Sequence, residues 1–456
     1  MRRFSLIGRL GSDDTCSIDT IQPDADVFEI DFLDDDGRIG FGIGHALDQL
    51  ASLGLQPSEK GIDLVILAAL VNAGDTRISR GLNAQDGWTR EIDLYVPVSD
   101  PSTWSANAKS TEAMLRFLTG DRWRVYYRER TRMTKTLSIA PQCLAIDGLT
   151  KASLLSGGLD SLVGAVDLLS RGEHRPLFVS HYWDSETARA QAYILDQLKS
   201  RFGKEAFKNI RVRLGFDKHH LDTGETENTQ RGRSFLFYSL ATLSASAIDG
   251  WTIVDIPENG LIALNVPLDP LRFGALSTRT AHPYFISSMQ KLIDSLALNV
   301  GLSNPYRHKT KGEMVANCEN KAFLEYIVPN SMSCSSPAKA RYKKLSPRHC
   351  GYCVPCLIRR ASLEAGLDGD DETLYMVENL KGRVLASDQP EGKHVRSFQM
   401  MAKRIKANSG LAKILVHKPG PLHDEPEAIS DYADVFRRGI LEVDDLLKCV
   451  RTRPGG

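Results

Sequence analysis

The chain has 456 residues, of which 42% are apolar and 25% are charged. These fractions are ordinary for a soluble globular protein, and they exclude a disordered chain, a collagen-like chain and a coiled coil. Lys plus Arg and Asp plus Glu both number 57, so no net charge indicates nucleic acid or an anionic membrane as a partner.

The length predicts about three structural units, at roughly 150 residues each. The longest apolar run, Leu64–Val71, is far shorter than the ~20 residues that a membrane-spanning helix needs. Arg9 and Asp13 interrupt the apolar start of the chain, so we identify no signal peptide. We therefore expect a cytoplasmic protein with no membrane partner.

Residues 1–145 are expected to form one α+β unit. Alternating or apolar runs typical of strands surround one short amphipathic run typical of a helix. The expected strands are 26–33, 64–71, 90–98 and 122–130, and the expected helix is 111–118. No catalytic pattern is visible in this unit. Its role is left open between partner recognition, a scaffold and an oligomer interface.

A strand–helix rhythm begins near Ile146 and predicts a parallel, doubly wound α/β sheet. We assign residues 146–367 to this domain. The expected strands are 151–155, 174–183, 209–216 and 251–257, and the expected helices are 162–169, 186–202 and a segment after Arg233. Residues 368–456 are polar and are predicted to form a mostly helical C-terminal extension.

The sharpest motif lies between the first strand and the first helix of this domain. It consists of Ser156, Gly157, Gly158, Leu159, Asp160 and Ser161. Glycines let the backbone turn tightly and approach a ligand, and the amides of a first helical turn attract an anion. The two serine hydroxyls add donors, and the aspartate carboxylate is suited to hold Mg²⁺ beside bound phosphates. The alternative is an incidental Gly-Gly turn.

This motif differs from the other common phosphate-binding loops. It lacks the lysine of the Walker A loop and the spacing of the dinucleotide-binding fingerprint. It resembles instead the SGGLDS signature of PP-loop ATP pyrophosphatases. In that superfamily the loop binds the pyrophosphate of ATP, and the enzyme transfers AMP to a substrate oxygen.

Four of the eight cysteines cluster in the sequence, namely Cys334, Cys350, Cys353 and Cys356. In a reducing compartment such a cluster indicates a metal site, and four thiolates suit tetrahedral Zn²⁺ at a structural site. A complete cysteine set argues against a catalytic zinc, which keeps an open position. Three alternatives remain. They are an iron–sulfur cluster, four unrelated buried cysteines, and a nucleic-acid-binding zinc finger, which the basic stretch 339–360 would suit.

The SGGLDS loop followed by the cysteine segment resembles 7-cyano-7-deazaguanine synthase (QueC) over about residues 150–365. Residues 309–313 (KTKGE) resemble the family's Thr-Lys-x-Glu segment, with Lys311 in the lysine position. Residues 349–360 (HCGYCVPCLIRR) resemble its cysteine segment and the arginine-bearing helix that follows. Residues 230–234 (QRGRS) stand where the family has an Arg-Asn turn, but the asparagine is replaced.

Other segments are more similar to the divergent QueC-like proteins of bacterial anti-phage operons. Residues 256–283 carry IPENG and LSTRTAHP, where the ordinary synthase has an Asp-rich and Pro-Asp-Cys-Arg region. The ordinary synthase also lacks the N-terminal unit and the C-terminal extension. Length and layout favour the Qat-type group (QatC-like), with the QueC-like proteins of cyclic-oligonucleotide (CBASS) systems as second choice.

The resemblance implies ATP and Mg²⁺ as cofactors and a structural Zn²⁺. It implies nucleotide contacts from the SGGLDS loop and from Ser180 and His181 after it. The implied catalytic residues are Ser156, Asp160, Ser161, Lys311 and Arg233. The implied substrate contacts are Arg231, Arg233, Glu258, Arg279 and His282. Ordinary structural roles are the alternatives, namely surface arginines at 231 and 233, a turn residue at 258 and a histidine before proline at 282.

The ordinary synthase adenylates 7-carboxy-7-deazaguanine, lets ammonia form the amide, and spends a second ATP to make the nitrile. The resemblance therefore implies an ATP-dependent C–N ligase that acts on a small deazaguanine substrate. In the defence branch the acceptor is expected to be ammonia or an amine of a partner protein encoded nearby. The alternatives are a tRNA-modifying PP-loop enzyme and a non-catalytic nucleotide or zinc scaffold. The sequence leaves the acceptor and the oligomeric state open.

Overall fold

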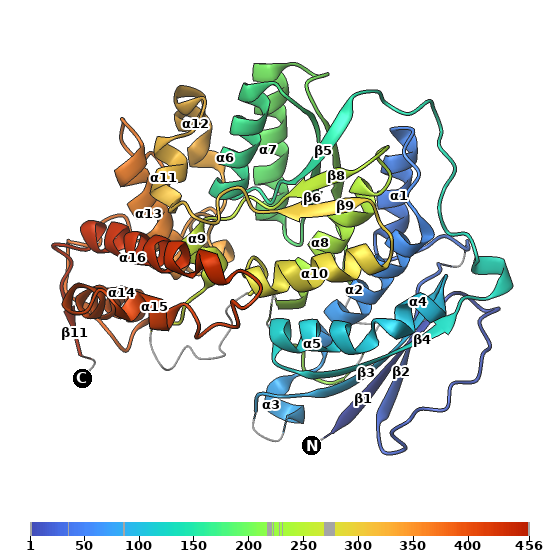
Figure 1. Cartoon of the computed structure of the whole chain (residues 1–456). Coiled ribbons are helices and arrows are strands. Elements are labelled where there is room, and N and C mark those ends of the chain that lie inside the picture. The colour runs from blue at the N-terminus through green and yellow to red at the C-terminus, as the bar shows by residue number, and fades with distance from the viewer. Residues whose placement is uncertain are drawn as a thin grey trace.

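The computed structural model describes residues 2–34, 36–84, 87–216, 221, 223–227, 229, 231–268 and 279–454. Within these residues the chain forms three sheets, which are four-stranded, five-stranded and two-stranded. Figure 1 shows the four-stranded sheet beside the five-stranded one, with the C-terminal helices packed at one side of the latter.

The N-terminal sheet has the strand order β2-β1-β3-β4, and its three strand pairs are all parallel. Its strands are β1 (Arg3–Arg9), β2 (Asp26–Asp31), β3 (Glu91–Val98) and β4 (Arg122–Glu129). Leu6 pairs with Leu94, which pairs with Val125, and all three side chains are buried. Since parallel strands need crossovers, the unit is α/β, and the expectation of an α+β unit is wrong.

The apolar run 64–71 lies in the middle of helix α2 (Glu59–Arg77), so the prediction of a strand there is wrong. Every residue from Gly61 to Arg77 is buried, because α2 lies between the N-terminal sheet and helix α8 (Arg231–Ala245). A helix covered on all sides has no polar face and therefore lacks the periodic pattern that identifies surface helices.

The predicted helix 111–118 is confirmed as part of α5. Besides α2, the helices of the unit are α1 (Ile43–Ser52), α3 (Arg80–Asn83), α4 (Pro101–Ala106) and α5 (Ala108–Thr119), and a 3-10 turn lies at Arg132–Thr134. In α4, Asp100 caps the amino end by accepting a hydrogen bond from Thr103 N.

The central sheet has the order β7-β6-β5-β8-β9, and all of its pairs are parallel, as predicted. Its strands are β5 (Leu149–Leu154), β6 (Arg175–His181), β7 (Lys208–Val212), β8 (Thr252–Asp255) and β9 (Val300–Ser303). The chain adds strands outward from β5 on one side and then returns to start β8 on the other. The topological switch point therefore lies between β5 and β8.

Helices cover both faces of the central sheet (Figure 1). They are α6 (Leu159–Arg171) and α7 (Ser185–Phe202) on one face and α8 and α10 (Pro283–Ser295) on the other. The shorter helices that follow the strands are α9 (Gly260–Leu264), α11 (Lys311–Ala316) and α12 (Lys321–Ile327). Two 3-10 turns, Val328–Asn330 and Pro337–Lys343, lead to α13 (Val354–Gly366).

One hydrophobic core runs through the N-terminal unit and the α8 face of the central sheet, from Phe4 to Val300. Helix α2 packs directly on α8, and α5 packs on α10. The two sheets are therefore joined through a shared double layer of helices rather than through a linker (Figure 1).

The C-terminal extension is mostly helical. It contains α14 (Pro390–Ala407), α15 (Leu411–Leu415) and α16 (Ile429–Leu446), a 3-10 turn at Pro426–Ala428, and a short parallel pair of strands, β10 (Leu385–Ala386) and β11 (Thr452–Arg453). Its core is continuous with α9 and α13 of the central domain. The extension thus packs on the elements that carry the cysteines and the PENG turn.

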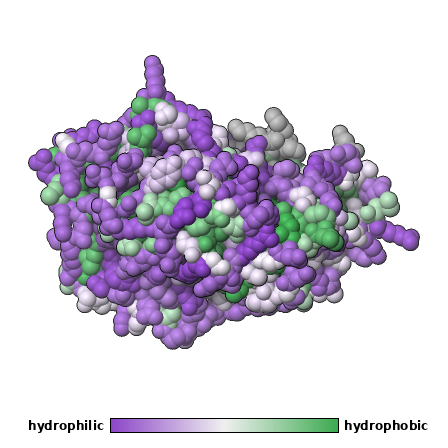
Figure 2. Space-filling model, turned by 90° about the horizontal axis from the view of Figure 1, so that it is seen from above, coloured by the Kyte–Doolittle hydropathy of each residue, from purple (hydrophilic) through white to green (hydrophobic). Residues whose placement is uncertain are grey.

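The face shown in Figure 2 is mostly hydrophilic, with small separate hydrophobic areas. Among the helices of the described residues, none is both long and apolar enough to cross a bilayer.

Candidate functional site

The SGGLDS loop follows β5 and leads directly into α6. Gly157 has φ +89°, a left-handed conformation that suits glycine, and Gly158 is the N-cap of α6. Ser161 Oγ accepts a hydrogen bond from Ser156 N (3.2 Å) and donates one to Gly158 O (3.0 Å). The hydroxyl of Ser161 therefore holds the turn closed. The predicted order of strand, glycine turn and helix is confirmed by β5, this loop and α6.

Asp160 lies in the first turn of α6 and is buried. Its Oδ2 accepts a hydrogen bond from Asn259 Nδ2 (2.7 Å), and its Oδ1 is 3.1 Å from Lys311 Nζ. These three residues come from the turn after β5, the turn after β8 and the start of α11. The loop and two distant segments of the sequence therefore meet at one carboxylate.

This meeting point is the switch point of the central sheet. In open parallel sheets, ligands bind beyond the carboxyl ends of the strands at the place where the strand order reverses. β5 and β8 are neighbours and their crossover helices leave in opposite directions, so the turns after them border one crevice. The strand order by itself therefore predicts a ligand-binding site at the place where the SGGLDS motif lies.

Glu258 completes an unusual charge arrangement beside Asp160. Burial and the neighbouring Asp160 carboxylate raise the pKa of Glu258 well above its ordinary value. Burial alone would raise the pKa of Asp160, but the Lys311 ammonium and hydrogen bonds from Glu258 and Asn259 hold it below its ordinary value. Two adjacent carboxyl groups therefore have pKa values that are shifted in opposite directions, and a divalent cation would be stabilised beside them.

Lys311 is presented by the amino end of α11. Thr310 and Glu313 form a reciprocal capping box there, with Thr310 Oγ1 accepting from Glu313 N and Glu313 accepting from Thr310 N. The carboxylate of Glu442 on α16 accepts hydrogen bonds from Thr310 Oγ1 and from Gly312 N. The predicted KTKGE segment is therefore a tightly capped helix start that aims Lys311 at Asp160.

Ser180 and His181 lie at the end of β6, and both side chains are buried. Ser180 Oγ donates to Leu155 O (2.8 Å), so this hydroxyl holds neighbouring strands together. Burial and the nearby Arg233 lower the pKa of His181 to about 3, so its ring is neutral. Gln191 of α7 links this strand end to the glycine loop by donating to Ser156 O and His181 O.

Arg233 is a residue of α8 and lies near His181, the last residue of β6. Burial lowers the pKa of Arg233, and the negative charge of Asp184 partly counteracts this. Its guanidinium makes no hydrogen bond with the residues that the structure describes. A half-buried guanidinium of this kind is available to an anion, as its predicted role requires.

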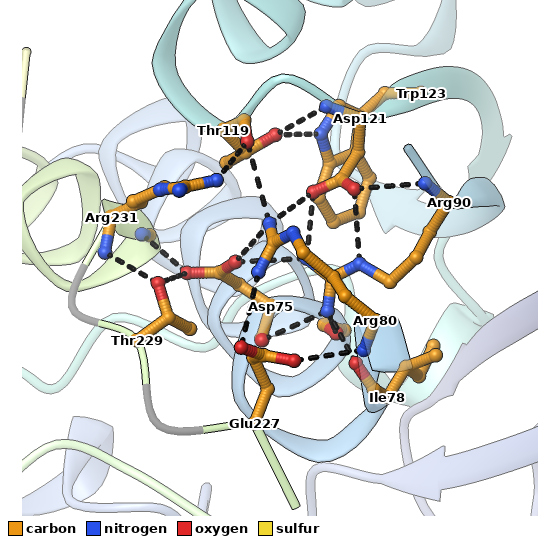
Figure 3. A network of polar contacts seen from close by, with 12 residues as sticks. Asp75, Ile78, Arg80, Arg90, Thr119, Asp121, Trp123, Glu227, Thr229 and Arg231 are labelled. Carbon is orange, nitrogen blue, oxygen red and sulfur yellow. Dashed lines mark hydrogen bonds and ion pairs between the residues drawn. The ribbon is translucent and has the colours of Figure 1, made fainter. Parts of the chain in front are cut away.

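Arg231 is directed elsewhere, although it precedes Arg233 by only two residues. Its guanidinium donates to Thr119 O (2.7 Å) and lies over the Trp88 ring at 4.6 Å. Figure 3 shows it at the edge of a polar network built around Asp75 and Asp121 of the N-terminal unit. The structure does not bring Arg231 together with Asp160, and its contacts give it a structural role at the junction.

Arg279 and His282 also contact the N-terminal unit. Arg279 donates to Phe117 O (3.3 Å) and lies over the Phe117 ring. His282 is the N-cap of α10, where its Nδ1 accepts from Tyr284 N (3.2 Å). Burial and Arg279 lower the pKa of His282 to about 3. These contacts match the structural alternative for His282, while residues 276–278 of the same segment lie outside the described residues.

The four clustered cysteines come together in space, with their sulfur atoms all within 4.8 Å of one another. The Sγ atoms of Cys350 and Cys356 are 3.8 Å apart. Backbone amides point at two of the sulfurs, Cys350 N at Cys334 Sγ and Cys353 N at Cys350 Sγ. Gly351, at φ +85°, makes the turn that permits this arrangement.

The cysteine segment touches the glycine loop directly. Met332 N donates to Gly157 O (2.8 Å), and Leu159 N donates to Ser333 Oγ (3.1 Å). Ser333 is adjacent to Cys334, so the cysteine cluster and the loop share one backbone turn. Arg359 of α13, fully buried, holds this turn by donating to Ser331 Oγ (2.8 Å).

Several residues of the site were not found from the sequence. They are Gln191, Asn259, Ser333 and Glu442. Asn259 stands next to the predicted Glu258, and a polar residue after a buried strand was a usable signal. Gln191 and Glu442 lie on helices whose sequence shows only amphipathic patterning, so nothing distinguished them from solvent-facing polar residues.

Comparison with protein-family models finds none that matches the chain, and comparison with curated proteins finds no match either. The resemblance to QueC therefore rests on the motifs and their spacing. The function has to be argued from the geometry of the switch-point site.

Proposed function

We propose that the protein activates a carboxylate by transferring AMP from ATP, with pyrophosphate as the leaving group. The observation that carries this is the convergence of Asp160, Glu258 and Lys311 at the switch point, immediately after a glycine turn that opens a helix. An ATP-binding site of the PP-loop type needs these parts, which are amides for the phosphates, carboxylates for a cation and a lysine for the leaving group.

The residues present fit Mg²⁺ and a polyphosphate. Oxygen ligands from two adjacent carboxyl groups suit a hard cation, and a divalent ion would offset the repulsion that raises the pKa of Glu258 beside Asp160. Mg²⁺ held there would screen the charge of the phosphates. Lys311 and the first amides of α6 would bind the pyrophosphate that leaves.

The cysteine cluster fits a structural Zn²⁺. A tetrahedral site with Zn–S bonds of about 2.3 Å has sulfur–sulfur edges of about 3.8 Å, and the Cys350–Cys356 pair is at this distance. An iron–sulfur cluster would need its four thiolates farther apart, because they bind different irons. A zinc there would fix the turn at 331–334 on which the glycine loop rests.

The reaction balances without any further reagent. A substrate carboxylate oxygen attacks the α-phosphorus of ATP, the bond to the β-phosphate oxygen breaks, and pyrophosphate leaves. An amine then attacks the acyl carbon, forms the C–N bond and releases AMP. The resemblance to QueC makes 7-carboxy-7-deazaguanine, or a related deazapurine carboxylate, the proposed substrate. The proposed acceptor is ammonia or an amine of a partner protein in anti-phage defence.

The test is to incubate the purified protein with ATP, Mg²⁺ and 7-carboxy-7-deazaguanine, with and without ammonium, and to identify the products by mass. AMP formation that depends on the base supports adenylation. An amide or nitrile identifies ammonia as the acceptor, whereas an adenylate that accumulates points to a protein amine. Formation of ADP, or no nucleotide product under either condition, would contradict the proposal.

One observation favours a second candidate, a PP-loop enzyme that modifies tRNA. Lys339, Arg341, Lys343 and Lys344 are exposed next to the cysteine cluster, and Tyr342 between them is 91% exposed. A basic surface with an aromatic side chain is typical of RNA-binding sites. Tight tRNA binding that weakens steeply with added salt would favour this candidate. Replacing these four cations with glutamine would then abolish the tRNA binding.

A further inference from the structure

The C-terminal extension forms hydrogen bonds with the residues on both sides of Lys311. Glu442 of α16 accepts hydrogen bonds from Thr310 Oγ1 (2.6 Å) and from Gly312 N (3.0 Å). Thr310 and Gly312 are the two sequence neighbours of Lys311. One carboxylate therefore fixes the residue before and the residue after the lysine that approaches Asp160.

Helix α11 has little stability of its own. It contains six residues, and an isolated helix needs about 12 residues or more to be stable in water. Its internal capping box satisfies Glu313 N and Thr310 N, which leaves Gly312 N to an outside acceptor. Glu442 supplies that acceptor and places a negative charge at the helix amino end, where the helix dipole favours it.

Helix α11 packs closely against both α13 and α16. A Cβ at Gly312 would stand 2.5 Å from Glu442 Oε2, and a Cβ at Gly366 of α13 would stand 2.7 Å from Val315 Cβ. On the other side of α16, a Cβ at Gly439 would stand 3.0 Å from Leu261 of α9. Helix α16 thus contacts α9, α11 and α13 together, which are the elements beside the PENG turn, the lysine and the cysteines (Figure 1).

We propose that Glu442 is a positioning residue for Lys311, and that the C-terminal extension serves to hold this lysine at the switch-point site. The inference rests on the proposed function, in which Lys311 binds the leaving pyrophosphate. Glu442 itself touches neither Asp160 nor the loop. It acts through the backbone of α11, which sets the 3.1 Å approach of Lys311 Nζ to Asp160.

The test compares Glu442→Ala and Glu442→Gln with the wild-type chain. Asp444→Asn is the matched control, because Asp444 lies on the same helix and pairs with Lys406 of α14. Two readouts are measured on the full chain. They are kcat and KM for AMP formation, and hydrogen–deuterium exchange of peptides that contain residues 309–318.

We expect Glu442→Ala to lower kcat about tenfold or more, since it removes two hydrogen bonds to a charged acceptor. Glu442→Gln is expected to lose less, because the amide oxygen keeps one of the two bonds. Exchange of the 309–318 peptides is expected to rise in Glu442→Ala and to stay unchanged in Asp444→Asn. A purely structural role would lower stability without changing kcat per folded molecule.

A double variant separates positioning of Lys311 from any other effect. If Glu442 acts through Lys311, Lys311→Ala/Glu442→Ala has the same kcat as Lys311→Ala alone. An additional loss in the double variant, or a wild-type kcat in Glu442→Ala, would overturn the inference. If the wild-type chain forms no AMP, the proposed function fails, and the exchange data then decide the inference. Unchanged exchange in Glu442→Ala would overturn it.

Discussion

Asp160 is the single residue on which the candidate site depends most. It is buried and contacts Lys311 at the start of α11 and both Glu258 and Asn259 of the turn after β8. A carboxylate in this setting can hold a cation and orient a lysine, and an amide in its place can do neither.

Asp160→Asn is therefore expected to abolish most AMP formation, with a loss of about a hundredfold or more in kcat/KM. Asp167→Asn is the control, because Asp167 lies on the same helix and is buried but accepts from Tyr306 OH instead. Both variants are compared by steady-state AMP release and by circular dichroism. Equal activity of Asp160→Asn and the wild-type chain would remove Asp160 from the mechanism.

Glu258 gives the protein a specific pH dependence. Its pKa in the folded state is raised above the unfolded value by burial and by Asp160. The folded state therefore binds the Glu258 proton more tightly than the unfolded state does. This binding contributes fully to the free energy of unfolding at pH values below the ordinary carboxyl pKa. The contribution is lost as the pH rises through the raised pKa. Glu258→Gln removes this titration.

We expect the free energy of unfolding of Glu258→Gln, relative to the wild-type chain, to increase as the pH is raised from about 5 to about 8 without Mg²⁺. Urea denaturation at several pH values measures it. A difference between the two proteins that does not change with pH would contradict the assigned shift.

At the scale of elements, the glycine loop is held by the cysteine segment and not only by its own strand and helix. Met332 and Ser333, which stand two residues and one residue before the first clustered cysteine, form hydrogen bonds with the loop. A metal ion that holds the four cysteines in place would therefore also hold the SGGLDS loop of the candidate nucleotide site in place.

Cys350→Ser is expected to lose one equivalent of zinc and to weaken ATP binding, although no cysteine contacts the nucleotide site directly. Elemental analysis and nucleotide titration measure these two effects. Cys318→Ser is the control, because Cys318 is buried outside the cluster. Retention of full zinc content in Cys350→Ser would show that the four thiols are not a metal site.

The amino end of α8 is held by the N-terminal unit. Asp75 of α2 accepts from Gly232 N (2.8 Å) and pairs with Arg80 and Arg90 inside a buried network (Figure 3). Because α8 also carries Arg233, the N-terminal unit contacts the helix that presents this arginine.

Asp75→Asn should therefore destabilise the whole chain by about 3 kcal/mol, since it leaves buried arginine charge without one of its partners. Urea denaturation measures the loss. Asp24→Asn, which breaks an exposed pair with Arg3, is expected to leave the free energy of unfolding nearly unchanged. Equal effects of the two variants would contradict the structural role of the network.

At the scale of the molecule, the sequence predicted the central sheet better than its surroundings. Strands with flanking helices, the glycine turn and the clustered cysteines carry their signals within short stretches of sequence. The helix at 64–71 and the positions of the Arg231 and His282 side chains depend instead on contacts with distant segments, such as Thr119 and Phe117. Patterns along the chain do not contain that information.

The measurement that tests the central claim most directly is ATP–pyrophosphate exchange in the presence of 7-carboxy-7-deazaguanine and Mg²⁺. Adenylation of the carboxylate is reversible, so labelled pyrophosphate should enter ATP only when the base is present, and no amine acceptor is needed. We expect exchange that depends on the base and that Lys311→Ala abolishes. Exchange that is absent in the wild-type chain, or that persists without the base, would contradict this expectation.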